Sequence, residues 1–222
     1  CKRCGIDDLL ITWWGGRSSS LAQTAGYIHY IESCSENSGY DLNERCKFLY
    51  GYTYDELCKL DIPNKIEAKT EATGMAEGNN PCFYILAEDP LLGIMESHIP
   101  ADAAQTFAQH AKTLAQLADR DGYLSYIFKF ETVLCEALAE KADLPKLVKD
   151  AYDQGDKARL KAIAKDKIPA VIEKMEAFRE RSRHLQKAKY QRMFVFGIFR
   201  PMVYMLHISC VMCLLYFGSR GY

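Results

Sequence analysis

Apolar residues recur at every third or fourth position through the second half of the chain, which places them on one face of an α-helix. Five such stretches follow one another, with polar residues, glycines and prolines between them. Helices joined by short connections bury their apolar faces most readily by packing antiparallel. The sequence therefore predicts a helical domain over residues 100–190, with helices at about residues 103–117, 124–138, 144–152, 158–164 and 169–189.

The same spacing predicts where individual residues of this domain lie, in the first turn of a helix or in the core. Pro169 suits the first turn of the last helix, because the amide that proline lacks would have no partner there. Cys135 lies within an apolar stripe with no base near it in sequence, so we expect a small buried side chain rather than a nucleophile. The residues expected to face the core are Ala103, Phe107, Ala111, Leu114, Leu117, Leu124, Phe128, Leu134, Leu138, Val171, Met175 and Phe178.

The first part of the chain has a different pattern. Residues 9–14 form a short, mostly apolar run that Gly15 and Gly16 end, which is typical of a strand buried on both faces. Helical spacing follows over residues 21–34, after serines that can cap a helix. These segments predict one βα unit.

Two short helices are expected next. Asp41 can cap the first, and Gly51 ends it. Thr53 and Glu56 have the spacing of a capping box at the start of the second, which should run through residue 60 before Pro63 closes it.

Two further segments flank the helical domain. Residues 66–99 contain a polar loop and an apolar stretch that Pro90 and Gly93 interrupt, so we expect an irregular connection that packs on the core. Residues 191–222 form an atypical apolar tail behind a run of basic residues. The mostly apolar part, residues 193–217, makes membrane contact possible, although its least polar stretch falls slightly short of the roughly 20 residues that a bilayer span needs.

The composition excludes two classes of protein. The chain has 222 residues, with 28 Lys plus Arg against 29 Asp plus Glu and a net charge of −1, so it lacks the positive field of a nucleic-acid binder. Hydrophobic residues make up 49% of it, enough for a buried core, which excludes a disordered chain. A complete β/α barrel of eight strands takes roughly 250 residues, so this length holds at most part of one.

Nine cysteines are spread mostly through apolar and helical segments, and we expect no signal peptide ahead of them. Their odd number and placement argue against a disulfide framework and for a reducing, cytoplasmic location. Two Cys-x-x-Cys pairs could offer four thiolates to zinc, but one lies at the extreme terminus and the other in an apolar run. The histidines lack metal-ligand spacing, and we expect neither a metal nor a cofactor. The two pairs are Cys1 with Cys4 and Cys210 with Cys213.

Several short motifs occur in order along most of the chain. They are Gly5-Ile6-Asp7-Asp8, Thr12-Trp13-Trp14-Gly15, Tyr54-Asp55-Glu56-Leu57, Leu60-Asp61-Ile62-Pro63-Asn64, Asp89-Pro90-Leu91-Leu92-Gly93, Ser97-His98-Ile99, Ile168-Pro169 and Met175-Glu176-Ala177-Phe178-Arg179. In this order they resemble the carboxyl-terminal part of bacterial glycoside hydrolase family 20 enzymes, the β-N-acetylhexosaminidases. The resemblance covers about residues 5–185, and Asp-Pro-Leu-Leu-Gly is its most specific piece.

The resemblance implies a fold. Residues 9–14 look like the last strand of a TIM barrel, so the expected fold class is mainly α, with a residual β/α unit followed by a helical domain. The domains expected are a carboxyl-terminal remnant of a (β/α)8 barrel at residues 1–65, the irregular connection at 66–99, the helical domain at 100–190 and the tail at 191–222.

The resemblance also implies an activity. Family members remove terminal N-acetylhexosamine from glycans by a retaining, substrate-assisted mechanism, in which the acetamido oxygen of the sugar attacks the anomeric carbon. A glutamic acid protonates the leaving oxygen and a neighbouring aspartate orients the acetamide, and both belong to an earlier barrel strand. The only Asp-Glu dipeptide here, Asp55-Glu56, falls in the first turn of a helix, where carboxylates serve as caps. We therefore expect no catalytic residue in this chain, and no activity from it alone.

Trp14 is the one residue to which the resemblance assigns a role in substrate binding. The matching tryptophan lines the pocket and packs on the apolar face of the sugar. The family usually has an acidic residue after Trp-Gly, whereas this chain has Gly16 followed by Arg17. The alternative is that Trp13 and Trp14 are core or exposed aromatic residues without a sugar contact.

Other functions stay open from the sequence. The chain could be a non-catalytic helical interaction module, or a small membrane-anchored helical protein whose basic run faces the cytoplasm. The tail departs from the resemblance, and a shifted reading frame near Lys189 is an alternative to a membrane anchor.

Overall fold

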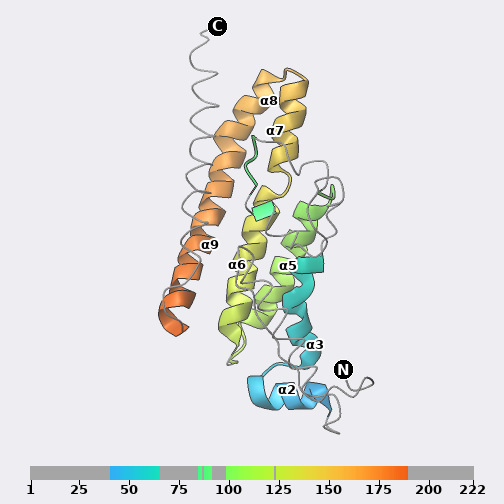
Figure 1. The fold of residues 1–222 in the computed structure, drawn as a ribbon, viewed down its shortest axis with the longest axis vertical. Coiled ribbons are helices and arrows are strands. Elements are labelled where there is room, and N and C mark those ends of the chain that lie inside the picture. The colour runs from blue at the N-terminus through green and yellow to red at the C-terminus, as the bar shows by residue number, and fades with distance from the viewer. Residues whose placement is uncertain (1–40, 66–84, 87, 92–98, 123, 190–222) are drawn as a thin grey trace, which may run out of the picture.

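The computed structural model describes residues 41–65, 85–86, 88–91, 99–122 and 124–189. These residues are mainly helical, and no strand occurs among them. The longer helices run along the long axis of the molecule, with α2 and α3 at one end and α7 and α8 at the other (Figure 1). In chain order, the elements are α2 (Leu42–Tyr50), α3 (Tyr54–Leu57), the 3₁₀-helix η2 (Cys58–Lys65), α5 (Ala103–Ala118), α6 (Ser125–Lys141), α7 (Leu144–Asp153), α8 (Lys157–Ala162), the π-helical turn η4 (Ile163–Lys167) and α9 (Ile168–Lys189).

The core lies between the three longest helices. Helix α5 packs along α6, and α6 packs along α9. Every residue that the spacing assigned to the core is buried, which confirms these predictions. Burying each large apolar side chain stabilises the fold by about 1.5–3 kcal/mol. The apolar faces of α5, α6 and α9 therefore account for the packing of these helices against one another.

The caps of the two short helices are confirmed. The Asp41 side chain accepts a hydrogen bond of 3.0 Å from the amide of Glu44, and Gly51 ends α2 with a left-handed φ of 80°. The Thr53 hydroxyl accepts from the Glu56 amide at 3.2 Å, while a Glu56 carboxylate oxygen accepts from the Thr53 amide at 3.0 Å. The reciprocal pair is the capping box that the sequence predicts.

The end of the second short helix differs from the prediction. Helix α3 ends at Leu57, and the chain continues as a 3₁₀-helix to Lys65 with Pro63 inside it. An α-helix through Pro63 would lose an amide hydrogen bond and press the proline ring against the carbonyl four residues earlier. A 3₁₀-helix pairs each amide with the carbonyl three residues earlier instead of four. The chain therefore stays helical past Pro63, the residue that was expected to end the helix.

The last two predicted helices are joined. Helix α8 passes through η4 directly into α9, which has Pro169 at its second position. Because Pro169 has no amide to donate, a regular α-helical bond is missing at this point. The wider π turn lets the amide of Ile168 reach the carbonyl of Ile163 five residues back. The predicted first-turn position of Pro169 is confirmed, but the predicted gap before it is absent.

Residues 41–65 share one buried core with the long helices. Tyr52 is fully buried, its hydroxyl donates to the carbonyl of Leu117 at 3.0 Å, and its ring centroid lies 4.6 Å from that of Phe128. Ile85 and Leu86 join the same core. The predicted βα unit before residue 41 and the apolar tail at 191–222 lie outside the described residues.

Candidate functional site

Several sequence-predicted features fall outside the described residues. These are Trp14, both Cys-x-x-Cys pairs and the apolar segment at residues 193–217. Within the part of the chain that the structure describes, no helix has the length and apolar character to cross a membrane. Across those same residues, no three His, Cys, Asp or Glu side chains gather into a group that could bind a metal ion.

The carboxylate of Glu56 is held in place by neighbouring residues. One oxygen accepts from the Thr53 amide, and the other forms an ion pair with the guanidinium of Arg120 at 2.5 Å. Burial by itself would raise the pKa of Glu56, but the Thr53 hydrogen bond and the positive charge of Arg120 together lower it. A carboxylate that stays ionised cannot act as a proton donor, so Glu56 is unsuited to general acid catalysis.

Asp55 stabilises the start of α3, as Glu56 does. Its side chain accepts a hydrogen bond of 3.0 Å from the Asn43 amide group, and its backbone amide donates to the Asn43 side-chain oxygen at 3.1 Å. These two bonds tie the start of α3 to α2. The prediction that Asp55-Glu56 belongs to a helix cap is therefore confirmed.

Lys141 is the most unusual charged residue in the described part of the chain. It is the last residue of α6, and only 1% of its surface is exposed. Its ammonium group donates to the carbonyl oxygen of Leu86 at 2.5 Å and to that of Glu88 at 2.7 Å. Burial lowers the pKa of Lys141 to about 7, although the nearby charges of Glu88 and Asp89 act in the opposite direction.

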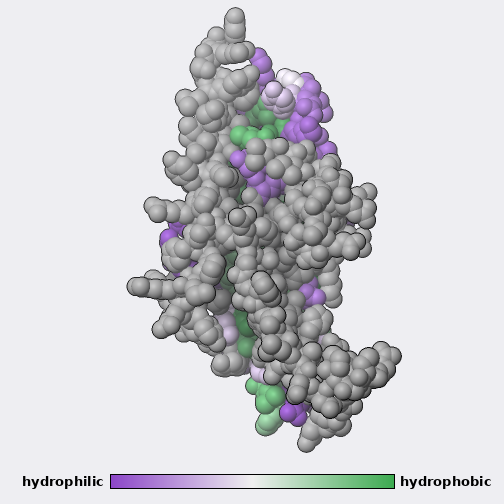
Figure 2. All heavy atoms as spheres, viewed as in Figure 1, coloured by the Kyte–Doolittle hydropathy of each residue, from purple (hydrophilic) through white to green (hydrophobic). Residues whose placement is uncertain are grey.

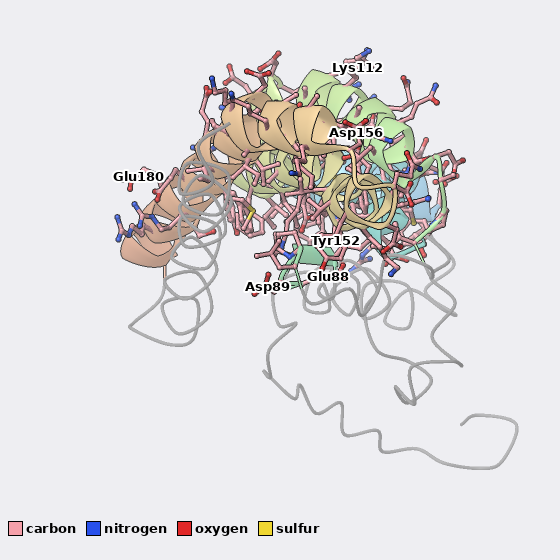
Figure 3. The ribbon with its side chains drawn as sticks, turned by 90° about the horizontal axis from the view of Figure 1, so that it is seen from above. Glu88, Asp89, Lys112, Tyr152, Asp156 and Glu180 are labelled. Carbon is pink, nitrogen blue, oxygen red and sulfur yellow. The ribbon has the colours of Figure 1, made fainter. Side chains whose placement is uncertain are left out.

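The segment that Lys141 holds carries the most specific motif of the chain. Asp89 accepts a hydrogen bond of 2.9 Å from the amide of Leu91, which forms an Asx turn around Pro90. Figure 3 shows Glu88 and Asp89 on this short segment at the edge of the helices. We call residues 85–91, of which residue 87 is not described, the clamped segment. Lys141 fixes its position, and Leu91 at its end is 46% exposed.

Sequence reasoning missed Lys141, although a signal for it was present. Lys141 follows Leu134 and Leu138 at the spacing of seven and three residues that keeps all three on one face of α6. A lysine in line with a buried stripe needs acceptors for its ammonium group, because an unpartnered buried charge is very costly. What the sequence could not supply was the identity of those acceptors, which lie more than 50 residues earlier.

Cys135 and His110 are two further side chains that could take part in chemistry. Cys135 is fully buried, which confirms the prediction of a small core residue. His110 on α5 is partly buried, and burial lowers its pKa. The described residues thus offer structural hydrogen bonds and ion pairs, and the lysine with the perturbed pKa is enclosed rather than open to a substrate.

A protein-family model matches much of the chain. The model of the family described as "Glycoside Hydrolase 20C C-terminal domain" matches residues 55–200. The match includes Asp55 and Glu56, the clamped segment, Lys141 and all of α5 to α9. No curated protein matches the chain.

Proposed function

The chain belongs to the glycoside hydrolase 20C C-terminal domain family, and we propose that it serves a family 20 enzyme that removes terminal N-acetylhexosamine from glycans. The observation that carries the proposal is the family match, which covers well over half of the chain. It agrees with the order of the motifs that it covers, from Leu60-Asp61-Ile62-Pro63-Asn64 to Met175-Glu176-Ala177-Phe178-Arg179, while the motifs before residue 55 lie outside the match. In this proposal the helices form a supporting domain and a (β/α)8 barrel performs the chemistry.

The proposed reaction is retaining and substrate-assisted. The acetamido oxygen of the bound sugar attacks the anomeric carbon, while a protonated glutamic acid gives its proton to the leaving oxygen. Water then opens the cyclic intermediate, so the product keeps the configuration of the substrate. Among the described residues, Asp55 and Glu56 are occupied as caps and Lys141 is enclosed, which supports placing the catalytic carboxylates on the barrel.

Trp14 is the proposed contact to the sugar within this chain. It stands at the end of the predicted barrel strand, where β/α barrels place their binding residues. An indole can pack on the apolar face of a hexosamine, whereas Gly16 offers no carboxylate to the sugar hydroxyls. A cytoplasmic location is part of the proposal, and the thiol form of Cys46, Cys58 and Cys135 supports a reducing compartment.

The test uses the full polypeptide that carries the barrel together with this chain. We expect it to release nitrophenol from nitrophenyl N-acetylglucosaminide but not from the nitrophenyl glucoside, which lacks the acetamido group. Glu56→Gln should leave this activity unchanged, whereas Glu→Gln at the Asp-Glu pair of the barrel should lower it by about 10²–10⁴-fold, the contribution of a general acid. Equal hydrolysis of both substrates, or loss of activity only in Glu56→Gln, would contradict the proposal.

A further inference from the structure

Two cysteines lie on neighbouring helical segments at one end of the molecule. Cys46 is on α2 and only 1% exposed, whereas Cys58, the first residue of η2, is only partly buried. Cys46 belongs to the core, and Cys58 packs against that core. Figure 1 places α2 and α3 at this end, and Figure 2 shows hydrophobic surface open to solvent there. A small solute can therefore reach Cys58 more readily than Cys46.

Hydrogen bonds between α2 and α3 bring the two cysteines to corresponding positions. The Asn43 amide group donates to the Asp55 carboxylate at 3.0 Å, and the Asp55 backbone amide donates to the Asn43 side-chain oxygen at 3.1 Å. Cys46 lies three residues after Asn43 on α2. Cys58 lies three residues after Asp55, and its backbone is still helical. Because residues three apart share one face of a helix, the thiols hold the next positions along the two joined faces.

The electrostatics of Cys46 also indicate that the two sulfur atoms are neighbours. Burial raises the pKa of the Cys46 thiol, and a negative charge on Cys58 raises it further, while Arg45 acts in the opposite direction. A charge acts on a thiol in this way only over a short distance. A thiol with a raised pKa stays protonated and reacts slowly with an oxidant. Cys46 is therefore suited to resolving an oxidised neighbour rather than to reacting first.

We propose that Cys46 and Cys58 are a peroxide-sensitive thiol pair, which on oxidation joins α2 to η2 through a reversible disulfide. The Cys58 thiolate attacks one oxygen of hydrogen peroxide and becomes a sulfenic acid, and the hydroxide released takes up the thiol proton as water. The Cys46 sulfur then attacks the Cys58 sulfur, the S–O bond breaks, and the hydroxyl leaves with the Cys46 proton as a second water. Two thiols thus give two electrons to one peroxide. The inference does not depend on the proposed function.

The test oxidises the full chain of 222 residues with hydrogen peroxide and maps its cysteines by mass spectrometry. Remaining thiols are blocked with iodoacetamide before digestion with trypsin, which cuts after Arg45, Lys47 and Lys59 and so separates the two cysteines. We expect the peptide of residues 46–47 to be joined to that of residues 48–59 until a reductant is added. Oxidation in denaturant should give at least tenfold less of this product, because the nine cysteines then pair without the native geometry.

Variants test the order of the two steps. Cys46→Ser removes the resolving thiol, so the sulfenic acid at Cys58 should persist and give at least tenfold more dimedone adduct than in wild type. Cys135→Ser is the matched control, because it removes another fully buried cysteine and should leave the disulfide and the low adduct level unchanged.

Three outcomes in the wild-type chain would overturn the inference, and none depends on whether a variant folds. One is a sulfenic or sulfinic acid at Cys58 while Cys46 stays a thiol. Another is a disulfide that joins either residue to a different cysteine, in the same chain or in a second copy. The third is equal formation of the 46–58 disulfide in native and denatured chains, because the fold would then not bring the two thiols together.

Discussion

Gly122 is the position where one added methyl group should reveal how residues 41–65 are joined to the long helices. It lies in the connection between α5 and α6, and its φ is not in the left-handed region. A Cβ built at Gly122 would lie 2.4 Å from Cε2 and 2.9 Å from Cζ of the Tyr52 ring. Carbon atoms pack at about 3.5–4.0 Å, so Gly122→Ala forces the ring to move by more than 1 Å.

The cost of this movement can be worked from the contacts of Tyr52. The ring is fully buried, its hydroxyl donates to the Leu117 carbonyl at 3.0 Å, and it packs against Phe128. Losing the hydrogen bond costs about 1 kcal/mol and disturbing the aromatic pair about 0.5–1.5 kcal/mol. The lower entropy of alanine in the unfolded chain returns part of this. We expect Gly122→Ala to lower the free energy of unfolding by about 1–1.5 kcal/mol.

A double-mutant cycle tests the cause, with denaturant unfolding of the full chain followed by circular dichroism. In the Tyr52→Leu background the ring is absent, so Gly122→Ala should cost less than about 0.5 kcal/mol. Gly155→Ala is the matched control, because Gly155 has a φ of 64° and nothing within 4 Å of an added Cβ. Its cost of about 1–2 kcal/mol comes from the backbone and should be the same in both backgrounds. A penalty at Gly122 that survives Tyr52→Leu would refute the steric explanation.

Two further predictions concern Lys141 and the cap of α3. The folded pKa of Lys141, about 7 against an ordinary 10.5, means that the unfolded chain binds more protons between these values. The free energy of unfolding should therefore rise by about 3 kcal/mol from pH 6.5 to 9.5. Lys141→Met should lose that rise. An equal dependence of the free energy of unfolding on pH in wild type and variant would count against a lowered pKa of Lys141 in the folded protein. Thr53→Ala should lower the free energy of unfolding by about 1 kcal/mol, measured by thermal denaturation, because the first turn of α3 loses its side-chain acceptor. Thr53→Ser keeps that acceptor and should stay near wild type, and an equal loss in both variants would argue against the capping role.

The sequence predicts those parts of the fold that depend on neighbouring residues. The capping box of Thr53 and Glu56 needs only a spacing of three, and the stripe from Ala103 to Leu117 needs only the helical period. The α8 to α9 junction is also local, but proline usually marks a break, and the choice of a π turn depends on how α9 packs. The two chief surprises, the Tyr52 contact with Gly122 and the partners of Lys141, join segments more than 50 residues apart. No periodic pattern encodes such pairs.

These distant contacts fix the two ends of one helix. Tyr52 packs against Phe128 in the first turn of α6, while Lys141 at the last position of α6 holds the carbonyls of Leu86 and Glu88. The two positions are 13 residues apart, or about 20 Å along the helix axis. Segments that precede residue 100 therefore hold α6 at both ends. Because their apolar side chains lie in the same core as α5 and α9, they should unfold together with the long helices rather than detach as flexible connections.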